Sequence, residues 1–321
     1  MGYVQCGPIR VVAGAPICDP EILREIVTEF ESDAQRTHQR VCYFHVGPRF
    51  VTAIRELRHY SFACIGSLAC WHPREWHSSL RAHASLRYQI ARARNKQITV
   101  HEMLPGKAAN DAELRRIREE WLRRKHLPPL HFLIEPEIFG ELADRRLFVA
   151  QRDRHKIGYL LCTPIPNCNG WLFEQWAHTN HAPLGTSELL VHSAMSTFAS
   201  EGCATVTMGL IPLSSRAGIT LGEPGPLWLR LLLRFMRWTA NPLYNFKGLE
   251  YYKHKFRPHG FEPVYAVINH NHFQVGDVSA IAQAFAGSPL QLFAWKGLKK
   301  GLGQLRGIGP NSAGNRRSPR R

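Results

Sequence analysis

Several signatures that would assign a function at once are missing from this sequence. No run of 18 apolar residues occurs, and the N-terminus lacks the charged start and apolar stretch of a signal peptide. We therefore expect no membrane-spanning segment and a cytoplasmic location. No C-x-x-C, H-E-x-x-H or G-x-S-x-G motif is present. These absences argue against structural zinc, a zinc protease and a serine hydrolase, and the eight cysteines are expected to be reduced thiols.

Acidic residues are scarce. The chain of 321 residues has 25 Asp and Glu against 41 Lys and Arg, which gives a net charge of +16. Eight of the basic residues lie between Lys296 and Arg321, where no acidic residue occurs. Such a charge attracts polyanions, either nucleic acid or an anionic membrane face, although a merely solvated basic surface has the same composition.

The order of the expected elements indicates an α+β fold. In the first half, strands are expected at 9–13, 41–46 and 64–71, and helices at 21–33, 50–57 and 79–96, the first of them capped by Asp19 before Pro20. The second half gives a helix at 111–125, strands at 146–151, 157–164 and 170–178, a helix at 187–200, a strand at 204–210, a helix at 227–238, a strand at 263–268 and a helix at 278–285. This order matches the acetyltransferase (GNAT) fold, and the first half repeats it in a worn form.

Two acetyltransferase-like subdomains, each a mixed sheet flanked by helices, are therefore predicted. A turn at 104–107 marks the expected boundary, with a first subdomain at 1–104 and a catalytic subdomain at 105–295. The Gly-, Ser- and Arg-rich segment 296–321 is expected to be a disordered basic tail.

Two loops at the ends of predicted elements carry candidate site residues. In the loop 180–188, of sequence NHAPLGTSE, Gly185 permits an unusual backbone and Glu188 falls in the first turn of the next helix. Glu188 either complements the helix dipole or orients the ammonium of a substrate. At 207–214, of sequence TMGLIPLS, Gly209 ends a strand where the central strands of this fold splay, so that substrate could approach the backbone.

A third block, YNFKGLEYYKHKFRP at 244–258, interleaves basic and aromatic residues. A run of charge alone is usually a solvated surface, but cations beside aromatic rings suit a ligand that carries phosphates and bases. The candidates in this block are Phe246, Lys247, Lys253, Lys255 and Arg257.

These three blocks resemble the C-terminal domain of the phosphatidylglycerol lysyltransferases, the multiple peptide resistance factor family. The matching pieces are HAPLG at 181–185, MGLIPL at 208–213 and the block at 243–256, and the early GAP at 14–16 and the basic helix at 86–94 are also similar to that family. The resemblance covers about residues 1 to 270. It implies tandem acetyltransferase-like folds and transfer of an aminoacyl group from aminoacyl-tRNA to a hydroxyl of a lipid such as phosphatidylglycerol, with no other cofactor.

Roles for single residues follow from this chemistry. An aminoacyl ester is already activated, so the enzyme has mainly to position it and to stabilise the developing oxyanion. Lys247 or Lys255 is expected to stabilise that charge or to hold the terminal phosphates of the tRNA. Glu174 and Glu188 are expected to hold the ammonium. Arg216 and Arg257 are candidate contacts to lipid phosphate, because guanidinium pairs bidentately with phosphate.

Two other functions remain open. A coenzyme-A-dependent N-acyltransferase would need a glycine-rich turn for the pyrophosphate, and the segment 182–188 offers one glycine. A non-catalytic RNA- or membrane-binding protein with the same fold would suit the charge.

The segment 227–238, of sequence LWLRLLLRFMRW, places its arginines on one helical face and apolar residues on the other. Either it is a core helix or it lies on an anionic membrane surface, which predicts a peripheral protein. Because the family's transmembrane module is missing, a separate integral-membrane partner could supply an anchor.

Overall fold

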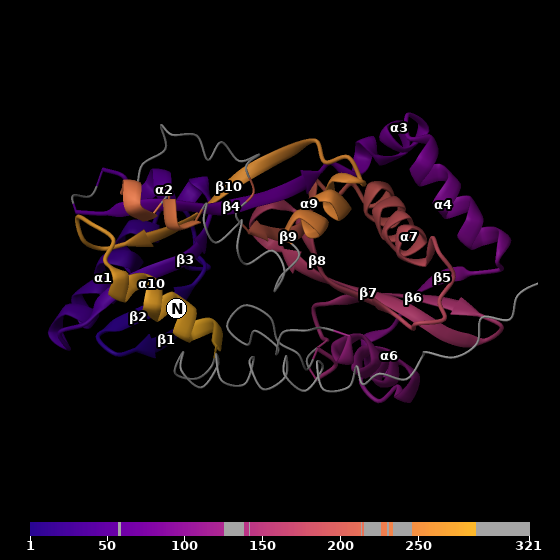
Figure 1. Ribbon diagram of the computed structural model, residues 1–321, viewed down its shortest axis with the longest axis horizontal. Coiled ribbons are helices and arrows are strands. Elements are labelled where there is room, and N and C mark those ends of the chain that lie inside the picture. The colour runs from indigo at the N-terminus through magenta and orange to yellow at the C-terminus, as the bar shows by residue number, and fades with distance from the viewer. Residues whose placement is uncertain are drawn as a thin grey trace, which may run out of the picture.

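A single ten-stranded sheet runs through the computed structural model, which describes residues 1–56, 59–124, 138–140, 142–212, 214, 226–229, 231–233 and 246–286 (Figure 1). The order of its strands is β1-β2-β3-β10-β4-β9-β8-β7-β6-β5. The strands are β1 (Tyr3–Cys6), β2 (Ile9–Ala13), β3 (Arg40–Val46), β4 (Ser61–Trp71), β5 (Thr99–Met103), β6 (Arg146–Arg152), β7 (His155–Ile165), β8 (Gly170–His178), β9 (Thr205–Pro212) and β10 (Gly260–Ile268).

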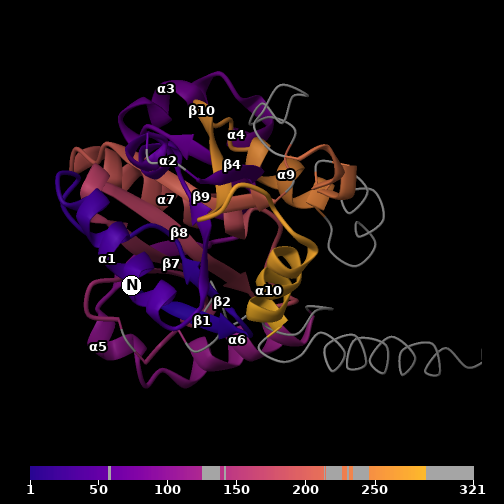
Figure 2. The same cartoon turned by 90° about the vertical axis from the view of Figure 1, so that its left-hand side faces the viewer.

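Helices cover both faces of this sheet. They are α1 (Leu23–Arg36), α2 (Pro48–Ile54), α3 (Trp76–Arg81), α4 (Ala84–Asn95), α5 (Pro105–Ala108), α6 (Ala112–Arg123), α7 (Thr186–Ser200), α9 (Phe246–His254) and α10 (Val275–Ala286), with 3-10 turns η1 (Pro73–Glu75) and η2 (Pro166–Cys168). In the half of the molecule built on β1 to β3, α1 and α10 lie on opposite sides of β1 and β2 (Figure 2). In the half built on β5 to β8, α7 and α4 lie on one side of the sheet and α6 on the other (Figure 1). The expected α+β class with tandem acetyltransferase-like folds is confirmed.

The alternation of side chains along β3 shows how the sequence builds these layers. Cys42 and Phe44 pack in the cluster that includes α10, whereas Val41 and Tyr43 pack in the cluster that includes α1 and α2. Successive residues of a strand point to opposite faces, so the uninterrupted apolar run 41–44 of β3 can be covered on both sides.

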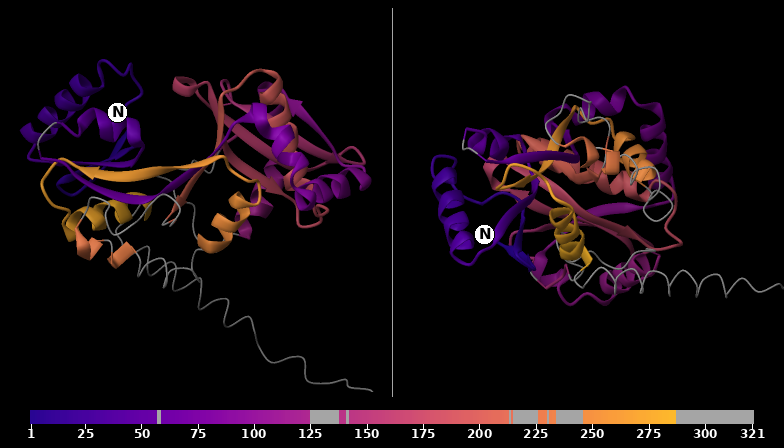
Figure 3. Two further views of the ribbon diagram at one scale, coloured as in Figure 1. Left: turned by 90° about the horizontal axis from the view of Figure 1, so that it is seen from above. Right: turned by 60° about the vertical axis from the view of Figure 1, so that its left-hand side comes forward.

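The sheet continues across the boundary expected near residue 104. β5 precedes this boundary in the chain and pairs with β6, which follows it, from Thr99–Gln151 to Met103–Leu147. β10, from the end of the described chain, lies between β3 and β4 and runs alongside β4 (Figure 3). The subdomain limits stay a prediction, and the proposed tail at 296–321 lies outside the described residues.

Most expected elements are confirmed, and three expectations are wrong in detail. The helix expected at 79–96 is two helices, because α3 ends at Arg81 and α4 begins at Ala84. The turn expected at 104–107 is the short helix α5. Asp19 does not cap α1, whose N-cap is Ile22; the Asp19 carboxylate accepts the backbone N–H of Glu21 instead.

The helical segment at 227–233 is described in part. Leu229, Leu232 and Leu233 pack on the first-half core beside Phe44 and Ala284. The three arginines of the expected helix at 227–238, namely Arg230, Arg234 and Arg237, lie outside the described residues. Among the described helices, none is long and apolar enough to cross a bilayer.

Candidate active site

Two neighbouring strands part at the centre of the second half. β8 and β9 run parallel and pair only from Gly170–Thr205 to Leu172–Thr207, although they continue to His178 and Pro212. Gly209 lies two residues beyond Thr207, the last paired residue of β9, and has a φ of +75°, which residues with side chains rarely adopt. The splay expected from the fold is therefore present, and Gly209 lies at its edge.

Helix α9 packs against this splay through two consecutive side chains. The ring of Tyr252 stacks on Trp176 of β8 with centroids 5.8 Å apart and planes 15° apart. The Nζ of Lys253 donates to the carbonyl oxygens of Gly209 and Leu210, both at 2.9 Å. α9 is thereby attached to both parting strands, which fixes the residues that follow it.

Lys253 differs from the solvent-facing cation that a charged run suggests. Only 3% of the residue is exposed, and burial lowers the pKa of its ammonium to about 7. The nearby His45, on β3, also has a pKa below its usual value, chiefly because it is buried; a backbone hydrogen bond partly offsets this effect, and the charge of Lys253 makes a smaller contribution that lowers the pKa. In the structure, Lys253 binds two backbone carbonyl oxygens of β9. Its expected contact with substrate stays a prediction.

Lys255 and Glu188 form the charged centre of the site. The Lys255 Nζ donates to Oε1 of Glu188, which lies in the first turn of α7. The side chain of Glu188 is 9% exposed and that of Lys255 is 28% exposed, so solvent reaches the pair from the lysine side. The charge of Glu188 also contributes, after burial, to the raised pKa of the Tyr252 hydroxyl. The fold thus brings together two of the candidate residues, which lie 67 positions apart in the chain.

Gly185 positions Glu188 by allowing α7 to begin against α4. Gly185 is the N-cap of α7 with a φ of +97°, and a methyl group on its Cα would lie 2.1 Å from the carbonyl oxygen of Gln89. No side chain fits in that space. The observed role of Gly185 is close helix packing, and its expected contact with substrate stays a prediction.

Glu174 has contacts other than those of the Glu188 pair. Its carboxylate accepts the Thr163 hydroxyl and lies 3.8 Å from an Arg145 nitrogen. Its expected binding of the substrate ammonium stays a prediction.

The remaining candidates lie around α9. Arg257 follows the helix with a φ of +52° and is exposed. Phe246 and Lys247 are in the first turn of α9, but their side chains lie outside the described residues, as does Arg216 entirely. Among the described residues, no group of His, Cys, Asp and Glu side chains is placed to hold a metal ion.

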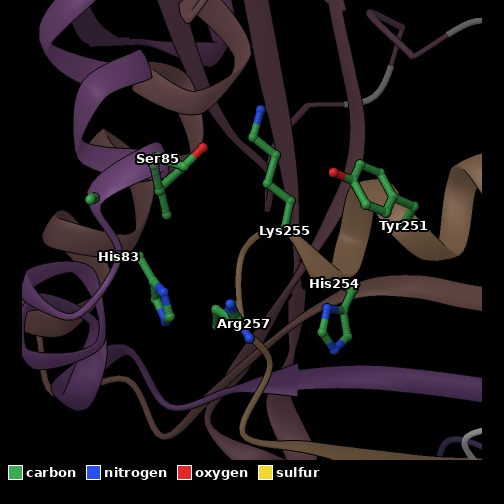
Figure 4. A pocket seen from close by; sticks show the side chains of 8 residues that line it. His83, Ser85, Tyr251, His254, Lys255 and Arg257 are labelled. Carbon is green, nitrogen blue, oxygen red and sulfur yellow. The ribbon is translucent and has the colours of Figure 1, made fainter.

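A pocket of about 360 Å³ adjoins the ion pair on its solvent side. Its walls come from the start of α4 and the end of α9, namely His83, Ala84, Ser85, Leu86, Tyr251, His254, Lys255 and Arg257 (Figure 4). Sequence reasoning missed the α4 side because it read 79–96 as one helix. No Gly or Pro marks the break, and His83 at the N-cap makes no side-chain cap that a pattern could reveal.

Comparison with known proteins identifies a family and two similar structures. Residues 3–268 match the family described as phosphatidylglycerol lysyltransferase, C-terminal. The C-terminal domain of a putative lysylphosphatidylglycerol synthetase from Agrobacterium fabrum has a similar structure, with a TM-score of 0.70 at 20% identity over 88% of this chain and 83% of that one. The structure of L-PGS from Bacillus licheniformis gives 0.68 at 20% identity with the same coverage. No curated protein matches in sequence.

A more distant structure extends the similarity in fold. FemX aligns with a TM-score of 0.50 at 11% identity over 84% of this chain and 81% of that one.

Proposed function

The chain belongs to the family of phosphatidylglycerol lysyltransferase C-terminal domains and is an acyltransferase, and from this premise we propose that it moves an aminoacyl group from aminoacyl-tRNA to a hydroxyl of an anionic phospholipid. The observation that carries the proposal is the ion pair of Lys255 and Glu188 beside the splayed strands. The site combines a solvent-accessible ammonium with a buried carboxylate, and no covalent nucleophile is needed for an ester that is already activated.

The transfer requires one bond to form and one to break. The lipid hydroxyl oxygen attacks the ester carbonyl carbon, the bond from that carbon to the ribose oxygen breaks, and the hydroxyl proton ends on the ribose oxygen. The carbonyl oxygen carries negative charge in between, and the ammonium of Lys255 stabilises it. Glu188 fixes the direction of Lys255 and shares its carboxylate with the ammonium of the aminoacyl group. A preformed charge that is partly buried acts more strongly than one in water.

The same carboxylate argues against coenzyme A as the acyl donor. A pyrophosphate would bind at the N-terminus of the helix that follows β8, where backbone N–H groups and the helix dipole favour anions. Here Glu188 already supplies a buried negative charge in the first turn of α7. Gln89 of α4 also approaches the turn at Gly185. We therefore give the donor role to aminoacyl-tRNA.

We assign contact with the membrane to the segment at 227–233. Leu227, Trp228 and Leu231 are 57%, 38% and 54% exposed, while the neighbouring leucines hold the segment on the core. An anchored segment with exposed Trp and Leu suits the interface of a bilayer. Peripheral binding at the cytoplasmic face follows, and an integral-membrane partner remains a further proposal.

Incubation of the protein with a pool of charged tRNA carrying labelled amino acids and vesicles of phosphatidylglycerol tests this function. We expect label in the lipid extract that depends on both substrates. A second arm replaces the tRNA by labelled acetyl-coenzyme A and offers a polyamine and a peptide amine as acceptors. Acetylation there, without labelled lipid in the first arm, would reject aminoacyl transfer in favour of the coenzyme-dependent alternative.

A further inference from the structure

The pocket between α4 and α9 is surrounded by nitrogen-bearing side chains. His83 lies on the α4 side, and His254, Lys255 and Arg257 lie on the α9 side (Figure 4). Among the described residues that line it there is no carboxylate. The Glu188 carboxylate is close by but is bonded to Lys255. A cavity of this composition attracts an anion.

The start of α4 strengthens that attraction. The N-cap, His83, makes no side-chain cap hydrogen bond, and the first residues of this 12-residue helix line the pocket. The positive end of the helix dipole therefore faces the same space as the basic side chains. Burial lowers the pKa of His83, and the neighbouring charges of Arg257 and Arg87 lower it further.

Three features indicate a nucleic acid strand rather than a lipid headgroup. Tyr251 is 79% exposed at the wall of the pocket, as a ring on which a base stacks would be. Beyond the first turn of α4, Tyr88 is 63% exposed, and Arg94 and Arg87 are exposed, with the Arg87 guanidinium also donating to the carbonyls of Leu80 and Arg81. A nucleic acid strand presents several phosphates to such cations, whereas a lipid presents one.

The apolar surface suited to a membrane is elsewhere. Leu227, Trp228 and Leu231 belong to the segment that packs with β10 and α10 in the first half. Helix α4 lies at the opposite end of the molecule (Figure 1).

We propose that the pocket between α4 and α9 holds a backbone phosphate of the single-stranded 3′ end of aminoacyl-tRNA, with Arg257 and the start of α4 as its contacts. The inference rests on the proposed function and specifies which surface receives the donor. Lys255 lines the pocket and also touches Glu188, so a strand held there brings its terminal ester to the ion pair. Arg257, first considered for lipid phosphate, is thereby assigned to RNA.

The test measures binding of two probes to the full chain. One probe is a fluorescent single-stranded RNA ending in C-C-A, and the other is phosphatidylglycerol vesicles. Ser85→Glu places a carboxylate in the pocket at a helix start that tolerates acidic residues. Thr28→Glu, on the exposed side of α1, is the control with the same change of charge. Arg257→Asn removes the guanidinium with a residue that accepts positive φ.

We expect Ser85→Glu to weaken RNA binding by about tenfold or more, while Thr28→Glu stays within about twofold of the wild type. Arg257→Asn should lower the slope of log K against log salt by about 0.7, the value for one phosphate of a single strand. Vesicle binding should be unchanged in all three variants.

Two outcomes would overturn the inference. The first is equal RNA binding by Ser85→Glu and Thr28→Glu. The second is loss of vesicle binding by Ser85→Glu or Arg257→Asn with RNA binding retained, which would show that the pocket binds the lipid. Transfer to lipid by the wild type is measured in parallel. Labelled lipid together with intact RNA binding by Ser85→Glu rejects the inference alone. Selective loss of RNA binding without any labelled lipid supports the inference and rejects the proposed function.

Discussion

Replacement of Lys253 by Met should change how the stability of the protein depends on pH. In the wild type the buried Nζ of Lys253 donates to the carbonyl oxygens of Gly209 and Leu210 at 2.9 Å. A neutral amine keeps two N–H donors and serves both carbonyls, whereas a charged ammonium must also be removed from water. Methionine is similar in length and has no proton to lose.

The size of the effect follows from the pKa of Lys253, which burial lowers from 10.5 to about 7. Between these values the unfolded chain binds a proton that the folded protein has lost, so the stability of the wild type rises with pH. The destabilising contribution is complete below about pH 7 and disappears as pH rises through the unfolded pKa. The slope approaches about 1.4 kcal/mol per pH unit once the folded-state lysine has lost its proton, so the wild type should gain about 2 kcal/mol over the variant between pH 7 and 9.

Urea unfolding followed by tryptophan fluorescence at pH 6, 7, 8 and 9 measures this difference. Other groups titrate alike in both proteins and cancel when the two free energies of unfolding are subtracted. His45 does not interfere, since its pKa lies below the ordinary 6.5. Parallel curves for the two proteins from pH 7 to 9 would show that Lys253 stays charged, and the account of its position would be refuted.

Three further changes test the surroundings of the site. Gly185→Ala should cost at least about 2 kcal/mol in the free energy of unfolding, because its methyl meets the Gln89 carbonyl at 2.1 Å and its φ is +97°; a variant as stable as the wild type would contradict that contact. His192 is buried and its pKa is lowered to about 4, so the wild type should lose about 3 kcal/mol more than His192→Gln as the pH falls from 6.5 to 4. Equal losses in chemical denaturation would refute this. A double-mutant cycle of Trp176→Leu and Tyr252→Leu should give a coupling of about 1 kcal/mol in the free energy of unfolding, because the two rings stack. Additive effects of the two substitutions would contradict this contact.

The sequence was informative wherever a local pattern decides the structure. Short apolar runs predicted β3 and the three strands β6, β7 and β8 to within a few residues. Turn residues set the ends of those strands. Glu188 and Lys255 were named as candidates for one site, Glu188 from its place in the first turn of a helix and Lys255 from the basic and aromatic block, but the ion pair between them was not predicted.

Long-range placement was beyond the sequence. β10 (Gly260–Ile268) lies between β3 and β4, which come from the start of the chain, and a local pattern of apolar residues does not specify such distant partners. The break before α4 was hidden because neither Ala82 nor His83 is a helix breaker, so the positive helix end in the pocket was missed.

The environment of a lysine also requires the folded structure. In the sequence, Lys253 and Lys255 are equivalent members of one basic run. In the fold, spacing by two residues around the end of α9 sends one to backbone carbonyls in the interior and the other to Glu188 at the edge of a pocket. Burial separates a structural lysine from a catalytic candidate, and burial is not a local property.

The central claim is that the ammonium of Lys255, held by Glu188, stabilises the oxyanion of aminoacyl transfer. Single-turnover transfer to phosphatidylglycerol vesicles by Lys255→Gln tests it most directly, with Lys107→Gln on the exposed part of α5 as the matched control. The account predicts a rate about 10² to 10³ times lower for Lys255→Gln and an unchanged rate for the control. A rate for Lys255→Gln within about twofold of the wild type, in a protein with normal circular dichroism, would contradict the claim.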